Sequence, residues 1–197
     1  MDHYVMDYET LSNCFLGVFE HYKKDEVKVF TIGLLRNDLD KLLDFFHENI
    51  EQNQWHISFN GLNFDAQITE YILQNEEYLR NLDGEEAAKK IYSKAQDCIN
   101  RSNAGEFQEW SEKKMSIKQI DIFKLNHWDN RAKLSSLKWI QCSMNWHNVQ
   151  DMPIEHTANI TTVPELQEIA KYCRNDVSST KRVMQLCAKE IRLRTRS

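Results

Sequence analysis

Residues 4–10 read YVMDYET, and this stretch sets the first strand of the fold. Tyr4 and Val5 are good strand formers, and in a strand the side chains of Asp7 and Glu9, two positions apart, project from the same face. Two carboxylates side by side in a partly dry site cannot both ionise comfortably unless a cation neutralises them, and a divalent metal is the natural partner. The same pattern also fits a solvated strand end with two ordinary acids. The rest of the chain has to decide between these interpretations.

Length and composition indicate one globular domain. The chain has 197 residues, of which 41% are hydrophobic and 28% charged, and no apolar run approaches the length needed to cross a membrane. The start, Met1-Asp2-His3, lacks the basic and apolar segments of a secretory signal. We therefore expect a cytoplasmic protein without membrane contact, in a bacterium or, for a viral protein, in its host. The domain is expected to span residues 1–197.

The cysteines favour a reducing compartment rather than a disulfide framework. There are five of them, widely spaced and without a Cys-x-x-Cys pair. Cys142 together with His127, His147 and His156 could in principle form a structural zinc site, but their spacing fits none of the compact ligand pairs. The alternative is a set of surface histidines and a core thiol.

The apolar patterns predict an α/β fold with a mixed five-stranded sheet flanked by helices. Three strands joined by short loops predict an antiparallel meander, and a strand that follows a helix beginning at Asp38 predicts a parallel neighbour. The predicted strands cover residues 4–10, 14–19, 27–33, 55–59 and 117–123.

Further helical patterns complete the chain. One covers residues 64–82, and another, starting at a capping box formed by Asp83 and Glu86, is expected to be an elaboration of about residues 83–106 packed on the rim. A helix is expected near residues 131–142. The last helix begins after Thr162, with proline in its first turn, and runs to about Ile191.

Two later stretches carry polar residues at positions suited to chemistry. Residues 59–65 read FNGLNFD directly after the fourth strand, where open α/β sheets place functional groups, although Asp65 alone also fits a helix cap. In the last helix, Tyr172 and Asp176 are four residues apart and share one face. Asp is a poor helix former in mid-helix, although an exposed polar position would also explain Asp176.

Taken together, Asp-x-Glu in the first strand, Asn-x-x-x-Phe-Asp after the fourth and Tyr-x-x-x-Asp in the last helix resemble the three exonuclease motifs of the DEDD superfamily. The resemblance is to the tyrosine-containing branch, and is closest to the proofreading 3′–5′ exonuclease domain of family B DNA polymerases. It spans about Tyr4 to Met184, and the helix from Asp83 to Asn103 has no counterpart in it. Lys171 stands where the histidine-containing branch has its histidine, which disfavours that branch.

The resemblance implies a ribonuclease H-like fold and assigns roles to individual residues. It implies that Asp7 bridges two metal ions, that Glu9 and Asp176 complete the ion on the nucleophile side, and that Asp65 holds the other, partly through water. Four carboxylates suit two Mg²⁺ or Mn²⁺ ions, which clamp the attacking and leaving oxygens of an in-line displacement. Tyr172 would orient the attacking water, since an unperturbed phenol is too weak an acid to be the assumed base. The implied positions that grip the terminal nucleotide are Thr10, Leu11, Asn60, Asn63 and Phe64.

The implied function is a 3′–5′ exonuclease that hydrolyses the 3′ end of single-stranded DNA to nucleoside monophosphates, proofreading for a DNA polymerase. The chain would act alone, as a subunit beside a separate polymerase, or as a part of a larger polymerase. A ribonuclease trimming short RNA, and a non-catalytic nucleic-acid-binding module, are the alternatives. The net charge of −5 argues against a generally basic coating protein, but residues 113–138 carry seven basic residues against two acids. With Trp128 and Trp139 this segment fits a single-strand groove, or a solvated face with core tryptophans. The basic residues 192–196 fit a contact with nucleic acid, a contact with a partner, or a solvated tail.

Overall fold

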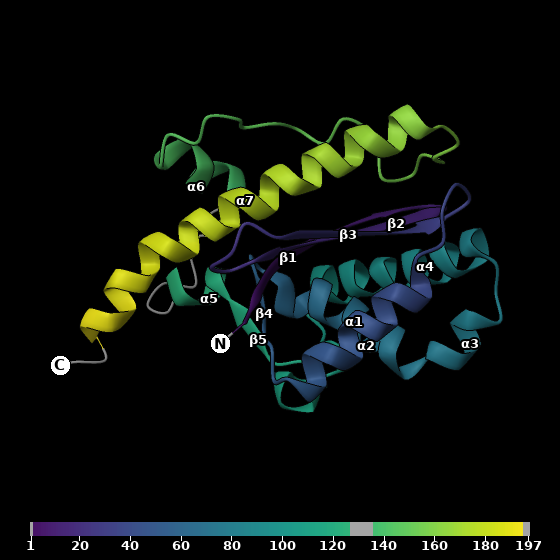
Figure 1. Cartoon of the computed structure of the whole chain (residues 1–197), viewed down its shortest axis with the longest axis horizontal. Coiled ribbons are helices and arrows are strands. Elements are labelled where there is room, and N and C mark those ends of the chain that lie inside the picture. The colour runs from purple at the N-terminus through teal and green to yellow at the C-terminus, as the bar shows by residue number, and fades with distance from the viewer. Residues whose placement is uncertain (1, 127–135, 195–197) are drawn as a thin grey trace.

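The computed structural model describes residues 2–126 and 136–194, and it has three layers (Figure 1). A twisted five-stranded sheet forms the middle layer, the long helix α7 (Val163–Arg194) crosses one face, and helices α1 to α4 cover the other. No helix in the described ranges is both long and apolar enough to cross a membrane.

The sheet confirms the predicted mixed topology. Its order is β3-β2-β1-β4-β5, with β1, β2 and β3 antiparallel and β1, β4 and β5 parallel. The strands are β1 (Tyr4–Leu11), β2 (Cys14–His21), β3 (Val27–Gly33), β4 (His56–Ser58) and β5 (Gln119–Asp121). The fifth strand is shorter than predicted, because the chain turns directly into a short helix, α5 (Ile122–Asn126), that the sequence pattern did not indicate.

The register of the parallel strands creates an open edge beside β1. Val5 lies opposite Ile57, and Ser58 lies opposite Asp121, so β4 and β5 both end level with Met6. β1 continues for five more residues, paired on its other side with β2. The part of β1 that carries Asp7 and Glu9 therefore has no strand neighbour on the β4 side.

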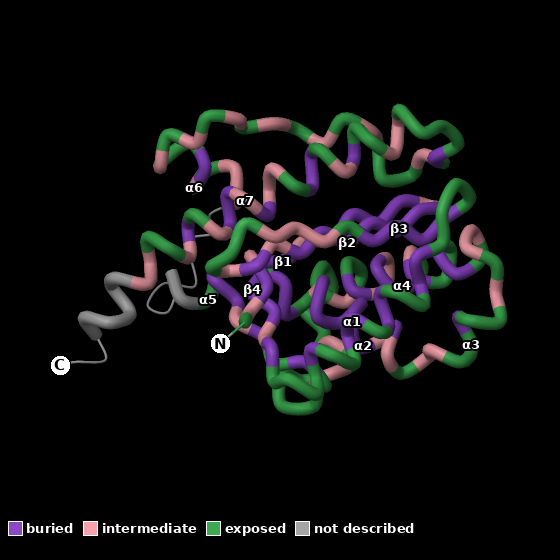
Figure 2. Tube along the Cα trace, in the orientation of Figure 1, coloured by how far each residue is buried: buried purple, intermediate pink, exposed green. Residues whose placement is uncertain are grey.

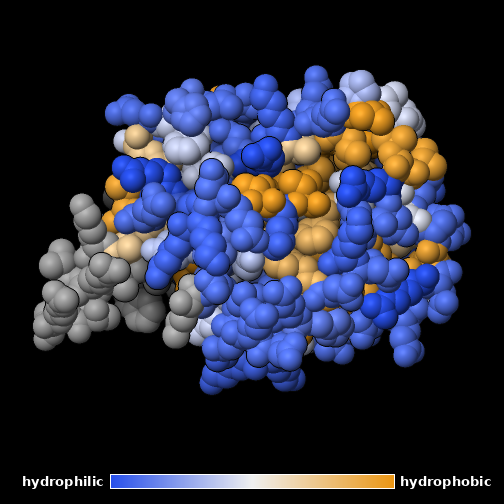
Figure 3. Space-filling view, in the orientation of Figure 1, coloured by the Kyte–Doolittle hydropathy of each residue, from blue (hydrophilic) through white to orange (hydrophobic). Residues whose placement is uncertain are grey.

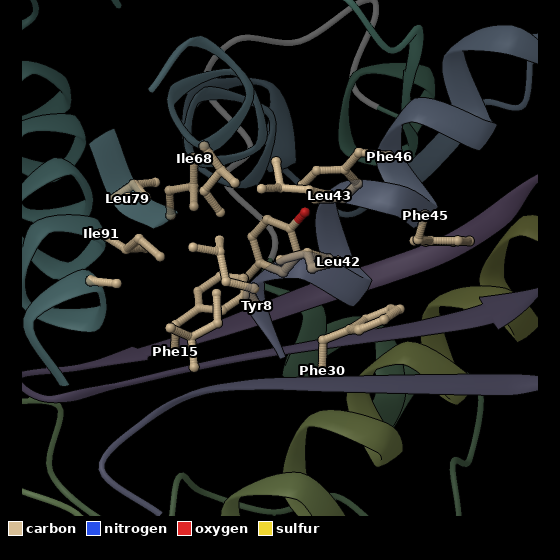
Figure 4. Close-up of a cluster of buried hydrophobic side chains, with 14 of the residues drawn as sticks. Tyr8, Phe15, Phe30, Leu42, Leu43, Phe45, Phe46, Ile68, Leu79 and Ile91 are labelled. Atoms are coloured by element: carbon tan, nitrogen blue, oxygen red, sulfur yellow. The ribbon is translucent and has the colours of Figure 1, made fainter. Parts of the chain in front are cut away.

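One face of the sheet packs against α1 (Leu39–Glu51), α2 (Asp65–Gln74), α3 (Glu76–Arg80) and α4 (Gly84–Ala104). Tyr8, Phe15 and Phe30 of the strands meet apolar residues of all four helices in one cluster (Figure 4). The helical pattern predicted over residues 64–82 is divided at Asn75, whose backbone N–H and side-chain amide both donate to the backbone oxygen of Tyr71.

The expectation that the helix at 83–106 packs on the rim is wrong. Its capping box is present as predicted, but α4 lies across the face of the sheet, and Ala88, Ile91 and Ala95 are fully buried in the main core. Small side chains let the helix approach the strands closely. At its start, a Cβ on Gly84 would lie 2.5 Å from the backbone oxygen of Gly33.

The opposite face packs against α7. Cys173 and Val177 of α7 are buried against Val5, Leu16 and other strand residues, and burial along α7 follows the side that faces the sheet (Figure 2). The helix predicted near 131–142 is α6 (Leu137–Ser143), capped by Ser136; residues 131–135 lie outside the described ranges. Figure 3 shows that the outer helix surfaces on this side are hydrophilic, with apolar side chains gathered between α7 and the opposite helical layer.

Candidate active site

Asp7 and Glu9 lie on the face of β1 that α7 covers. Glu9 is 6% exposed and Asp7 is half-buried. Cys173 of α7 packs on them: its thiol donates to the backbone oxygen of Asp7 at 3.4 Å and lies 3.8 Å from Asp7 Oδ2. The two carboxylates are thus inside the interface between sheet and helix, not on a solvated strand end.

Asp65 reaches the same place from the other helical layer. It is the first residue of α2, and its Oδ1 accepts the backbone N–H of Tyr8 at 3.2 Å, so the helix-cap interpretation of Asp65 is wrong. The N–H is available because β4 has already ended at this level of β1. Thr69 fixes the arrangement, since its Oγ1 donates to the backbone oxygen of Asp65 and pairs with the Tyr8 hydroxyl at 2.7 Å.

The loop before Asp65 is held by a buried carboxylate that the sequence analysis did not single out. Asp121, at the end of β5, accepts the backbone N–H groups of Asn60 (2.8 Å), Leu62 (3.3 Å) and Phe123 (3.0 Å). It lies opposite Ser58 at the point where the loop leaves β4. An acid inside the predicted strand 117–123 is the one hint that the sequence carries, and it does not show which groups the carboxylate binds.

Gly61 lets this loop pack against Asp65. A Cβ at Gly61 would lie 2.1 Å from Ser58 Oγ and 3.0 Å from Asp65 Oδ2, which leaves no room for any other residue. Asn60 before it adopts a left-handed conformation, with φ of 58°, which asparagine tolerates better than most residues. The short helix η1 (Gly61–Asn63) then leads into α2.

Tyr172 and Asp176 come to the site from α7. Tyr172 is 8% exposed, and Asp176, one turn later, is half-buried. Gln141 of α6, which is completely buried, donates its Nε2 to Asp176 Oδ1 at 3.0 Å and to Ser179 Oγ at 2.7 Å. The sequence offered no signal for Gln141, because its partners are 35 and 38 residues away.

The electrostatics of the cluster favour a bound cation. Burial, strengthened by the carboxylates of Asp65, Glu9 and Asp176, raises the pKa of Asp7 well above its usual range. Burial, with Asp176 and Asp65, also raises the pKa of Glu9 to about 8, and burial raises the pKa of Asp65 to about 7. Within the described ranges, no Lys or Arg forms an ion pair with these acids or with Asp176, whose pKa is raised by burial too.

The donor set fits a hard divalent ion. Among the residues that the structure describes, Asp7, Glu9 and Cys173 form the one group whose potential ligand atoms all lie within 4.8 Å of one another. Burial raises the pKa of the Cys173 thiol well above its ordinary value, so the thiol stays neutral and the carboxylate oxygens remain as ligands. The structure does not support the zinc alternative. Cys142, His147 and His156 are exposed and belong to no such group among the described residues, and His127 lies outside those residues.

The predicted nucleotide-contacting residues are found in two places. Asn60 and Asn63 are exposed, and Phe64 is half-buried, in the loop directly before Asp65. Thr10 and Leu11 are buried on β1, and Leu11 packs with Ile160 and Ile169. The basic segment falls partly outside the described residues, which omit Trp128; within them Trp139 is exposed, so it is not a core tryptophan.

In a sheet of this order, Asp65 of α2 and Asp176 of α7 lie near enough to Asp7 and Glu9 of β1 to raise the pKa of Asp7, although neither belongs to the tighter group of Asp7, Glu9 and Cys173. This arrangement defines a ribonuclease H-like fold with the acidic site of a metal-dependent nuclease. The comparison with protein families agrees: the model described as RNase_H superfamily matches residues 6–188, and the chain belongs to this superfamily. None of the curated proteins compared with the chain matches it. The family match supports a hydrolase of the nuclease class.

Proposed function

We propose that the protein is a 3′–5′ exonuclease of the tyrosine-containing DEDD branch, which removes nucleotides from the 3′ end of single-stranded DNA as nucleoside monophosphates and proofreads for a DNA polymerase. One observation carries the proposal: four carboxylates from three elements converge without a cationic partner in the described ranges, with Tyr172 one turn from Asp176. Without a bound cation, these carboxyl groups relieve their repulsion by keeping protons, as their raised pKa values show, and a divalent ion would take the place of those protons.

In this mechanism Asp7, Glu9, Asp65 and Asp176 hold two Mg²⁺ or Mn²⁺ ions. Such ions, when bound, polarise the scissile phosphate and lower the pKa of an attacking water. Tyr172 supplies orientation rather than base catalysis, because burial and the carboxylates of Asp176 and Glu9 raise the pKa of its phenol far above neutrality. The protonated hydroxyl can donate a hydrogen bond to the water or the phosphate. Asn60, Asn63 and Phe64 would receive the terminal nucleotide at the loop that Asp121 fixes.

The test uses a 5′-labelled single strand with Mg²⁺ or Mn²⁺. We expect stepwise shortening from the 3′ end, and a loss of at least about a thousandfold in rate for Asp7→Ala, because a carboxylate that would hold the metal ions is removed. Asp44→Ala, which removes an exposed acid of α1, is the matched control and should keep full activity. Circular dichroism checks that both variants fold.

Parallel strands of RNA identify the substrate. Faster degradation of the DNA strand supports the proposal, and exclusive degradation of RNA would replace it with an exoribonuclease, since the 2′-hydroxyl distinguishes the two substrates. Equal activity of Asp7→Ala and the unchanged protein would refute the assigned site. Metal binding with no turnover of either strand would instead favour a binding module.

A further inference from the structure

A cavity of about 320 Å³ opens beside the loop that precedes Asp65. Leu62 and Asn63 of η1 form one wall, the loop from Phe107 to Glu112 forms another, and Lys124 of α5 completes it. Because η1 follows β4 and α5 follows β5, the cavity lies at the carboxyl edge of the parallel strands, which is also the edge that carries the acidic site. None of the four acids lines the cavity, but Leu62 and Asn63 in its wall belong to the loop that ends at Asp65.

The two walls are joined by one buried side chain. Gln67 is 1% exposed; its Nε2 donates to the backbone oxygens of Leu62 (3.2 Å) and Trp110 (2.8 Å), and its Oε1 accepts the Trp110 N–H at 3.1 Å. Lys94 lies over the Trp110 ring, 4.8 Å from its centre, and is itself held by Glu109 and Asp97. The hydrogen bonds of Gln67 and the contacts of Lys94 therefore hold the wall of the cavity in place.

Phe107 gives the cavity an aromatic surface in water. Its side chain is 94% exposed, more than any other large apolar residue in the described ranges. Its backbone is nevertheless anchored, since Arg101 donates to its carbonyl oxygen and the neighbouring Gln108 donates to the carbonyl oxygen of Cys98. An anchored, unpacked aromatic ring is the kind of platform on which single-stranded nucleic acids stack their bases.

The charges around the cavity suit a phosphate. Lys114 and Lys124 line it, and neither forms an ion pair with any described residue. Of the two acids in the lining, Glu109 is neutralised by Lys94 at 2.6 Å, which leaves Glu112. Counting ion pairs among the described residues alone, two cations and one acid of the lining are unpaired; with two aromatic rings beside them, they match the alternating phosphates and bases of a single strand.

We propose that this cavity is a subsite for the single strand directly 5′ of the terminal nucleotide, with a base stacked on Phe107 or Trp110 and a phosphate near Lys114 and Lys124. The inference rests on the proposed function, because it assigns the path of that enzyme's substrate. It also gives α4 a role, since this helix supplies Lys94 and, through Arg101 and Cys98, the anchors of the loop.

The experiment compares two substrates of one enzyme: a decathymidylate strand and the p-nitrophenyl ester of thymidine 5′-monophosphate, which has no upstream nucleotide. For Phe107→Ala we expect the ratio of kcat/KM on the strand to kcat/KM on the ester to fall about tenfold, within the range expected for one stacked base. Phe107→Trp should restore the ratio. Tyr78→Ala, which removes a half-exposed aromatic ring of α3 outside this cavity, is the control and should leave the ratio unchanged.

The lysines are tested by salt dependence. In the Asp7→Ala background, where the strand stays intact, binding of labelled decathymidylate is measured by anisotropy at several salt concentrations. Lys114→Ala/Lys124→Ala should flatten the plot of log K against log salt by about 0.7 per lost phosphate contact, whereas Lys23→Ala/Lys41→Ala should not. An unchanged substrate ratio for Phe107→Ala together with an unchanged slope would overturn the subsite. Failure of the unchanged protein to degrade any strand would instead overturn the proposed function.

Discussion

At the scale of single residues, Tyr172 allows the clearest test of mechanism. Because its phenol stays protonated throughout the working pH range, it can donate a hydrogen bond but cannot take a proton. We expect Tyr172→Phe to lower kcat by about ten- to a hundredfold, as for loss of a positioning contact, while Mn²⁺ binding measured by calorimetry stays the same. The pH profile should keep its shape. A variant that loses metal binding, or the basic limb of the profile, would contradict a positioning role.

The residues of the candidate site divide according to what a sequence can reveal. Asp7, Glu9, Asp65, Tyr172 and Asp176 were predicted because the three motifs that contain them together resemble those of the DEDD superfamily, whereas the local spacing of each motif alone also fitted ordinary acids or a helix cap. Asp121 and Gln141 were missed because the contacts that matter for the site are with distant segments: the backbone N–H groups of Asn60 and Leu62 in one case, Asp176 and Ser179 in the other. A carboxylate or an amide of this kind has no local signature, and only the fold shows its partners.

At the scale of elements, the loop between β4 and α2 is set by close packing. Gly61→Ala would place a Cβ against Ser58 and Asp65, so the loop and the carboxylate have to move. We expect a loss of about 1–3 kcal/mol in unfolding free energy and a drop of at least about tenfold in kcat/KM. The control is Gly84→Ala, whose Cβ would meet the Gly33 backbone at 2.5 Å, far from the site, and which should lose stability but keep activity. Full activity of Gly61→Ala would show that Asp65 does not depend on this packing.

The helices and strands also show what the hydrophobic periodicity of the sequence cannot predict, namely the packing partner of a helix and the exact end of an element. β3 and the start of α7 were predicted closely, because alternation and capping residues are local signals. The apolar stripe of α4 was visible as well, but a stripe does not say what it packs against, and the helix lies on the sheet rather than on its rim. β5 ends at Asp121, where α5 begins, and α2 ends at Asn75, which caps it with both its backbone and its side-chain amide. Neither changes the hydrophobic pattern.

At the scale of the whole molecule, buried His56 and the buried site carboxylates make the folding stability change with pH in opposite directions. His56 is completely buried in the aromatic core, and burial lowers its pKa to about 3. Its contribution is fully present above its ordinary pKa of about 6.5 and is lost as the pH falls below that value. The site carboxylates have raised pKa values in the folded state, so their contribution is present at low pH and is lost as the pH rises. Above about pH 6.5, only the carboxylates, and not His56, therefore make the folding stability depend on pH.

Because His56 and the carboxylates titrate in different pH ranges, the effect of metal binding at the carboxylates can be measured through the Tm above pH 6.5. In EDTA, we expect the Tm to fall between about pH 6.5 and 8, because folded Glu9 and Asp65 lose protons there, with pKa values of about 8 and 7, while the unfolded chain is already deprotonated. Divalent ions bind the deprotonated native site, so Mg²⁺ or Mn²⁺ should raise the Tm most at pH 8 and flatten the curve. In EDTA, the Tm of the Glu9→Gln variant should also fall less over this pH range, since the substitution removes one of the repelling charges. A Tm that is constant or rises over this range in EDTA would mean that the four carboxylates do not share one desolvated site.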